Sequence, residues 1–159
     1  MYVRKNKKLS RGYRNNNPLN IRKGSKWMGL SQDQPDRDFC CFSSMAYGFR
    51  AAFIILCKSY YGKKVVTIDG IIRRWAPSSE NDTESYILRV CKALRITRYT
   101  MLPKPAVGTK NIWVDLALAM ANHENGFTYQ GLQGDASLGF DLVFPPTEKR
   151  KQNETRSVC

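Results

Sequence analysis

Glu124 is the residue of this chain whose type and position best suit catalysis. It lies one helical turn after Met120, in line with the apolar stripe of a helix predicted over Asn111–Asn125. A carboxyl group against an apolar wall tends to keep its proton near neutral pH, which suits a general acid that cleaves a glycosidic bond. The same position also fits a solvated carboxylate, or one paired with a cation such as His123 or a lysine.

Glycosidic cleavage passes through an oxocarbenium-like state and needs a second group. Three carboxylates, Glu80, Asp82 and Glu84, lie just before or at the start of a second helix, predicted over residues 83–94. If Asp82 caps that helix, Glu80 is the freer base. If none of the three approaches Glu124, the acetamido group of the substrate or a water held by Tyr86 can take this role.

These residues must be positioned by a mainly helical domain. Apolar periodicity and capping residues predict four helices, over residues 43–61, 68–75, 83–94 and 111–125. Short strands are predicted at 20–23 and 26–30, paired as a hairpin around Gly24 and Ser25, with a third at 38–42. Residues 127–144 hold three glycines and are predicted to be irregular. The expected fold class is α+β, dominated by helix, with a small β-hairpin layer.

The chain length fits one domain with two polar ends. Residues 1–13 are predicted to be a flexible basic arm, 14–144 the folded domain, and 145–159 a disordered tail without apolar content. The 159 residues carry a formal charge of +13, which favours polyanionic partners such as nucleic acid, an anionic cell wall or a membrane surface. No zinc-finger spacing, stacking platform or helix-turn-helix pattern supports nucleic-acid binding.

No apolar run approaches the roughly 20 residues of a membrane span, so no membrane-spanning helix is expected. The basic start lacks the apolar stretch of a signal peptide, which indicates synthesis in the cytoplasm and delivery by other means. Five cysteines show no metal-ligand spacing, and His123 is the single histidine. We therefore expect buried free thiols, no metal and no cofactor.

Four segments resemble the motifs of a family of small phage- and prophage-associated proteins. They are Arg14–Arg22 (RNNNPLNIR), Phe42–Ala51 (FSSMAYGFRA), Arg74–Tyr86 (RWAPSSENDTESY) and His123–Gly126 (HENG). Members are often described as virion structural proteins or lysozyme-like proteins, and the resemblance covers most of the chain. Leu19 stands where the family usually has glycine, and Ser78 where it usually has a second proline.

The same segments are similar, in rotated order, to those of bacterial cell-wall glucosaminidases, which have a lysozyme-like fold. The segments 16–22, 39–43 and 80–86 resemble the N-N-x-F-G-I-K hairpin, the strand before the next helix and the T-D-P-x-Y helix start of those enzymes. The Glu-Ser-Gly helix end, first in those enzymes, resembles 124–126 here. This order implies a circularly permuted lysozyme-like domain, which neighbouring chain ends would permit.

The resemblance implies cleavage of peptidoglycan glycan strands, by hydrolysis or by the lytic transglycosylase reaction. Glu124 is the implied general acid, and the candidates for the second group are Glu80, Asp82 and Tyr86. The implied substrate-binding residues are Asn16, Asn17, Asn20, Arg22, Trp27, Asn81, His123 and Asn125. Trp75 is a candidate either for stacking on a sugar or for the core.

Two other readings stay open. The first is a non-catalytic phage virion or assembly protein that keeps a glycan-binding, lysozyme-like fold, because a fold does not fix a function. The second is a basic nucleic-acid-binding protein, motivated by the charge alone. For the enzyme we expect a monomer that acts at the bacterial cell wall or within a phage particle, with other virion or secretion-apparatus proteins as further partners.

Overall fold

The computed structural model describes residues 8–146, which are predominantly helical. Residues 1–7 and 147–159, which hold most of the predicted basic arm and tail, lie outside this range. The elements in chain order are α1 (Arg11–Arg14), α2 (Met45–Phe53), the π-helix η1 (Ile54–Tyr60), α3 (Ile68–Trp75), α4 (Thr83–Leu94), the 3-10 helix η2 (Val107–Thr109), α5 (Lys110–Asn125) and α6 (Leu132–Val143).

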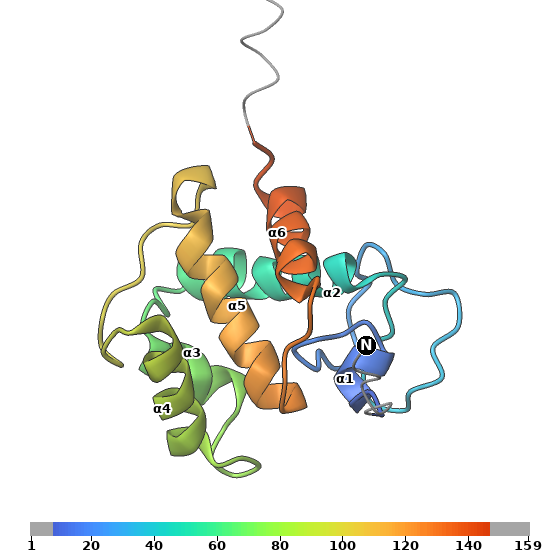
Figure 1. The fold of residues 1–159 in the computed structure, drawn as a ribbon, viewed down its shortest axis with the longest axis horizontal. Helices are drawn as coiled ribbons and strands as arrows, with labels where there is room; N and C mark the ends of the chain where they lie inside the picture. Colours follow the sequence, from blue (N-terminus) through green and yellow to red (C-terminus); the bar gives the residue numbers. More distant parts are fainter. Residues whose placement is uncertain (1–7, 147–159) are drawn as a thin grey trace, which may run out of the picture.

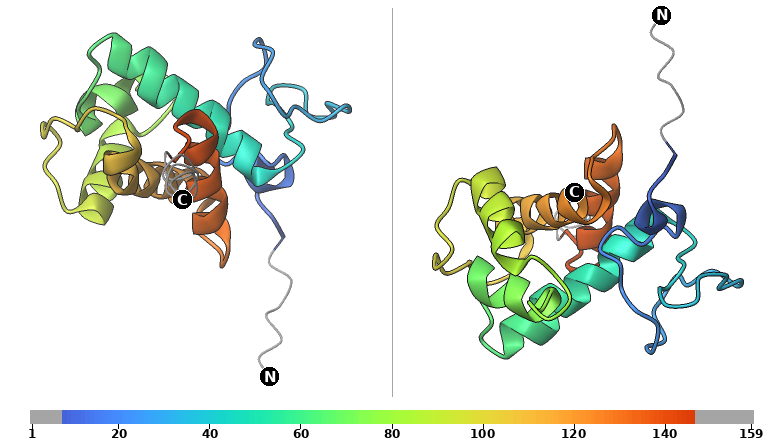
Figure 2. Two further views of the ribbon diagram at one scale, coloured as in Figure 1. Left: turned by 90° about the horizontal axis from the view of Figure 1, so that it is seen from above. Right: turned by 90° about the horizontal axis from the view of Figure 1, so that it is seen from below.

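Helix α5 is the centre of the arrangement. It packs against α4 on one side and against α6 and α1 on the other, and α2 crosses behind α6 and packs against it. Figures 1 and 2 show α3 and α4 at one end of the molecule and the irregular segment between α1 and α2 at the other. The C-terminal end of α5, which carries Glu124, therefore lies between the two ends of the fold (Figure 1).

The core is formed by aromatic and aliphatic side chains from every long helix. Trp113 of α5, Phe49 and Phe53 of α2, Tyr86 of α4 and Phe140 of α6 are all almost fully buried. The rings of Phe53 and Phe140 meet edge to face with centroids 5.3 Å apart, which ties α2 to α6. The buried face of α5, including Trp113, anchors this helix in the core and so positions its last turn.

Three of the four predicted helices begin and end close to the expected residues. The hydroxyl of Thr67 accepts a hydrogen bond from the backbone of Gly70 and caps α3, and Asp82 caps α4 through the backbone of Ser85. Gly126 ends α5 with a φ of 81°, a left-handed conformation that glycine adopts without strain. The fourth, predicted over 43–61, begins at Met45 and changes to π-helix at Ile54.

The prediction of an irregular 127–144 segment was wrong, because residues 132–143 form α6. Leu132, Ala136 and Phe140 recur every four residues and are buried, as in an amphipathic helix. Two glycines lowered the apparent helix propensity of the segment. Gly139 is needed for packing: an added Cβ would lie 2.6 Å from Cβ of Phe49 and 2.8 Å from the carbonyl oxygen of Ala46.

The predicted β-hairpin layer does not form, and the described residues contain no β-strand. The two segments expected to pair with each other instead pair separately with the 38–42 segment, through isolated bridges Arg22–Phe39 and Leu30–Phe42. Gly24 and Ser25 therefore lie in a longer loop and do not form the tight turn of a hairpin.

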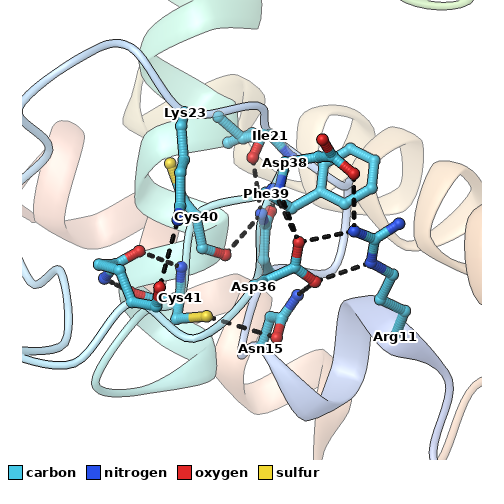
Figure 3. Close-up of polar contacts among 11 residues, drawn as sticks. Arg11, Asn15, Ile21, Lys23, Asp36, Asp38, Phe39, Cys40 and Cys41 are labelled. Carbon is cyan, nitrogen blue, oxygen red and sulfur yellow. Dashed lines mark hydrogen bonds and ion pairs between the residues drawn. The ribbon is translucent and has the colours of Figure 1, made fainter.

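Asp36 holds this irregular segment against α1 (Figure 3). Its carboxylate accepts two hydrogen bonds from the guanidinium of Arg11, both at 2.7 Å, and one at 2.8 Å from the amide of Asn15. The Arg11 guanidinium is the main reason that the pKa of Asp36 is well below its usual range. Residues 11–13, expected in the flexible arm, are thus part of the fold, and Tyr13 is buried.

No helix within residues 8–146 combines the length and the apolar character needed to cross a membrane. Four cysteines of this range are free thiols: Cys40, Cys41 and Cys57 are buried, and Cys91 is partly exposed. Burial raises the pKa of the Cys57 thiol to about 12, so this sulfur stays protonated and unreactive at neutral pH.

Candidate functional site

Glu124 lies at the C-terminal end of α5 and is held by residues from two other parts of the chain. Its Oε2 accepts a hydrogen bond of 3.0 Å from Nδ2 of Asn20, in the segment after α1. Its Oε1 accepts one of 3.2 Å from the hydroxyl of Tyr86, in α4. The carboxyl group is therefore fixed in position from both sides, as a catalytic acid must be.

Burial raises the pKa of Glu124 above its ordinary value. Hydrogen bonds from Asn20, Tyr86 and Trp75 act in the opposite direction, because they stabilise the charged form, but burial is the larger effect. The site thus combines burial, which raises the pKa of Glu124, with donors that stabilise the carboxylate after the proton has left. This is the pair of properties that a general acid requires.

Tyr86 acts as a donor to Glu124 and not as a base. Burial is the main cause, and the neighbouring Glu124 the second, of a Tyr86 pKa well above its ordinary value, so the phenol stays protonated. The ring of His123 stacks on that of Tyr86, with centroids 3.8 Å apart and an angle of 28° between the planes. Burial lowers the pKa of His123, which favours a neutral imidazole. His123 therefore supports Tyr86 and is no cationic partner for Glu124.

A pocket of about 200 Å³ opens beside Glu124. Its lining includes side chains from the segment after α1, the end of α3, the α3–α4 loop and α5: Asn20, Arg22, Trp75, Glu80, Asn81 and Glu124. Four of the predicted site residues, Asn20, Arg22, Glu80 and Asn81, are thereby brought to the predicted acid.

A second pocket of about 440 Å³ adjoins the first, with Asn20, Arg22 and Trp75 in both linings. It extends past Trp27 and Tyr60 along the π-helix η1. The two pockets are thus neighbours, with Glu124 in the lining of the smaller one and Trp27 in the lining of the larger one.

The three carboxylates of the α3–α4 region have different environments. Glu80 lies at the rim of the pocket with its side chain 68% exposed, and one of its oxygens is 3.9 Å from the Arg22 guanidinium. Asp82 accepts the capping hydrogen bond of α4 at 3.1 Å. Glu84 pairs with Arg98 and Arg73, which lower its pKa to about 2. Glu80 is thus the one of the three that lines the pocket.

Two of the asparagines in the 14–22 segment shape the backbone. Asn17 is fully buried and donates to the carbonyl oxygens of Ile21 and Cys40 at 2.9 and 3.0 Å. Asn16, in a left-handed conformation with φ of 50°, donates to the carbonyl oxygen of Phe42 at 3.0 Å. The sequence indicated substrate binding for both, whereas in this structure both are used in hydrogen bonds that build the turn before Asn20.

Asn125 is likewise engaged within the protein. Its amide donates to the carbonyl oxygen of Pro18 at 2.8 Å, and its side-chain oxygen accepts from the hydroxyl of Ser10 at 2.5 Å. These contacts attach the end of α5 to the segment that carries Asn20. Asn125 therefore holds the end of α5 close to the segment from which Asn20 donates to Glu124.

The sequence analysis predicted Asn20, Arg22 and Trp27 of the second pocket but not the residues of its helical wall. Ile54, Ile55, Ser59 and Tyr60 line it, and all lie on the π-helix. A π-helix leaves no signature in hydrophobic periodicity, which predicted an ordinary helix there. Trp75, for which stacking and core positions were both open, is partly buried and lines both pockets.

No family model matches the chain. It is similar to Protein P5 of Pseudoalteromonas phage PM2, with 37% identity over 138 residues, and the match covers 82% of each chain. The matched length exceeds that of a shared motif and takes in most of the fold described above.

Proposed function

We propose that this chain, which belongs to the same family as Protein P5 of Pseudoalteromonas phage PM2, is a phage-related enzyme that cleaves the glycan strands of peptidoglycan. The observation that carries the proposal is Glu124, a buried carboxyl group of raised pKa, held by Asn20 and Tyr86 beside an open pocket. A phage that must pass a bacterial wall has a use for this chemistry. The site would act at the wall or in the virion.

The geometry supports a specific division of roles. Glu124 would protonate the glycosidic oxygen of the leaving sugar, and Asn20 and Tyr86 would stabilise the carboxylate that remains. Glu80 would face the oxocarbenium-like state from the rim of the same pocket, either directly or through a water. The net charge of +13 would raise the rate of encounter with an anionic wall polymer.

The finer proposal for the fold is a circularly permuted lysozyme-like domain. It is supported by the direct contact between Glu124 and Tyr86, since the similarity to glucosaminidases requires the segments at 80–86 and 124–126 to meet. It is supported further by Asn20, which brings the segment at 16–22 to the same carboxyl group.

The test is the loss of turbidity of purified peptidoglycan with wild type and Glu124→Gln side by side, with mass analysis of the fragments. Asp115→Asn is the matched control, because it neutralises an exposed carboxylate on the same helix. We expect Glu124→Gln to lose at least about 100-fold in rate, the usual contribution of a general acid, and Asp115→Asn to lose nothing measurable. A folded wild type without lytic activity would contradict the proposal.

A second candidate is a virion protein that binds glycan without cleaving it. The relationship to a phage protein favours it independently of the site chemistry. It predicts that wild type and Glu124→Gln sediment equally with insoluble peptidoglycan and that neither releases fragments. Sedimentation abolished by DNA but not by soluble wall fragments would instead indicate the nucleic-acid-binding alternative.

A further inference from the structure

We propose that Ser10, at the start of α1, is a positioning residue for the Glu124 site: through Asn125 it keeps Asn20 within hydrogen-bond distance of the carboxyl group. The inference rests on the proposed function and adds a residue that lines neither of the two pockets. Ser10 belongs to the segment that the sequence predicted to be a flexible arm. The structure instead makes this segment one side of the support for the acid.

Helix α1 is held in place by its side chains. It has only four residues, and a helix of this length is not stable by itself. Arg11 binds Asp36 on one side (Figure 3). On the other side the Tyr13 hydroxyl donates a hydrogen bond of 2.6 Å to the carbonyl oxygen of Phe127, just after α5. The rings of Tyr13 and Phe127 meet edge to face with centroids 5.2 Å apart, so α1 is fixed against the end of α5.

The Ser10 hydroxyl joins α1 to the residue that follows the acid. It accepts a hydrogen bond from the backbone of Tyr13 at 3.3 Å, which caps α1, and donates one to Oδ1 of Asn125 at 2.5 Å. The amide nitrogen of Asn125 donates to the carbonyl oxygen of Pro18 at 2.8 Å and to one a turn back in α5 at 2.9 Å. Both ends of this amide are thus engaged. One side chain therefore connects Ser10 to Pro18, two residues before Asn20.

The backbone of α1 also lies directly against the Asn20 side chain. A Cβ added to Gly12 would lie 2.9 Å from Oδ1 of Asn20 and 2.5 Å from Oδ1 of Asn125, closer than side chains approach one another. Glycine is therefore required for this approach, and a larger residue would displace Asn20. With its oxygen against α1, the Asn20 amide donates from its nitrogen to Glu124 at 3.0 Å.

The strength of the Asn20 hydrogen bond depends on where this amide lies. A hydrogen bond to an ionised carboxylate is strong, and it weakens as its distance and angle depart from the optimum. The other charged or titratable groups around Glu124 come from α4, α5 and the pocket lining: Tyr86, His123, Arg22 and Glu80. Within residues 8–146 none of these four is hydrogen-bonded to Ser10 or Asn125. A change at Ser10 therefore reaches the acid through Asn20.

The test follows the carboxyl carbon of Glu124 by NMR through a pH titration of the full chain, so it needs no cleavage. Ser10→Gly removes the hydroxyl but keeps a residue that is tolerated at a helix start. The Glu124 midpoint should move to higher pH, because Asn20 then stabilises the carboxylate less well. Ser10→Thr keeps the hydroxyl and should titrate as wild type. Ser44→Gly is the matched control: this serine caps α2 through the backbone of Tyr47 at 3.4 Å and lines neither pocket.

A double-mutant cycle separates positioning from general destabilisation. In an Asn20→Gly protein the donor is already gone, so adding Ser10→Gly should move the Glu124 midpoint no further. Gly12→Ala should raise the midpoint of the wild type, because the new Cβ displaces Asn20. Gly134→Ala, where a Cβ meets nothing within 4 Å, should leave it unchanged.

An unchanged midpoint in folded Ser10→Gly would overturn the proposal, and so would a shift that adds in full to that of Asn20→Gly. In peptidoglycan cleavage, Ser10→Gly should lower kcat by roughly threefold to tenfold, as for the loss of one hydrogen bond, with KM unchanged. A change confined to KM would contradict the positioning role. Cleavage without the titration shift refutes that role alone, whereas the shift in a protein that cleaves nothing supports it and refutes only the enzyme.

Discussion

The side-chain amide of Asn20 donates a 3.0 Å hydrogen bond to the carboxyl group of Glu124, across 104 positions of sequence. Asn20 has a φ of 52°, in the left-handed region, where asparagine is better tolerated than most residues. The backbone turn built by Asn17 places this amide against the end of α5. The acid and the residue that modulates it are thus positioned by separate parts of the fold.

Under the proposed function, removing the Asn20 amide should shift the pH dependence of glycan cleavage. The amide stabilises the carboxylate, so Asn20→Gly should raise the pKa of Glu124 further and move the loss of activity with rising pH to higher pH. Glycine keeps the left-handed backbone free of strain. The measurement is kcat/KM against pH. Asn16→Gly is the control, because Asn16 has a similar φ of 50° but bonds to Phe42, and its profile should not shift.

The raised pKa of Glu124 also predicts a pH-dependent stability. The folded state holds this proton more tightly than the unfolded state, so the resulting stabilisation is complete below the ordinary pKa of 4.5 and is lost as pH rises through the folded value. Glu124→Gln has no such loss, and its Tm relative to wild type should increase as pH rises above about 4.5. Thermal melts across this range test it, and a Tm difference that is constant or falls with pH would contradict it.

The close packing of α2 on α6 predicts opposite effects for two glycines of one helix. Gly139→Ala places a Cβ 2.6 Å from Phe49 and 2.9 Å from the backbone nitrogen of Arg50, so it should destabilise the fold by about 1–3 kcal/mol. Gly134→Ala meets nothing within 4 Å and should stabilise by about 0.5–1 kcal/mol, because alanine favours helix. Urea denaturation of both variants measures the difference. Equal effects would show that the α2–α6 contact is looser than described.

Glu84 should stabilise the fold only above acidic pH. Hydrogen bonds from Arg98 and Arg73 lower its pKa to about 2, so its contribution is present above the ordinary value of 4.5 and disappears as pH falls toward 2. The Tm difference between wild type and Glu84→Gln should therefore vanish across this interval. It should also shrink in about 1 M salt, because these side chains are exposed. Glu80→Gln, at a looser exposed pair of 3.9 Å, should show a smaller change.

The helices that bear the acid and its tyrosine could be predicted because local signals agreed. For α4, Asp82 gave the cap and Tyr86, Ile87 and Val90 gave the buried face, and the structure has each of these features. For α5 the apolar stripe and Gly126 fixed the end of the helix, and with it the position of Glu124. These features depend on neighbours in sequence, which periodicity reports directly.

The remaining features depend on contacts between distant segments. Helix α6 was missed because Gly139, unfavourable in an isolated helix, is required by the approach of α2. The hairpin was wrong because the segment at 38–42 competes as a partner for both of its strands. The roles of Asn16 and Asn17 could not be read from their type, since an asparagine that builds a turn and one that binds a ligand have the same side chain.

The order of the site residues along the chain has a consequence for biosynthesis. Asn20, Trp75 and Tyr86 leave the ribosome well before Glu124, and α5 is the helix on which α1, α4 and α6 all pack. During synthesis the N-terminal two thirds of the chain therefore emerge before the helix that completes the core. The carboxyl group and the central helix arrive together, so the complete constellation exists only once the core has closed around α5.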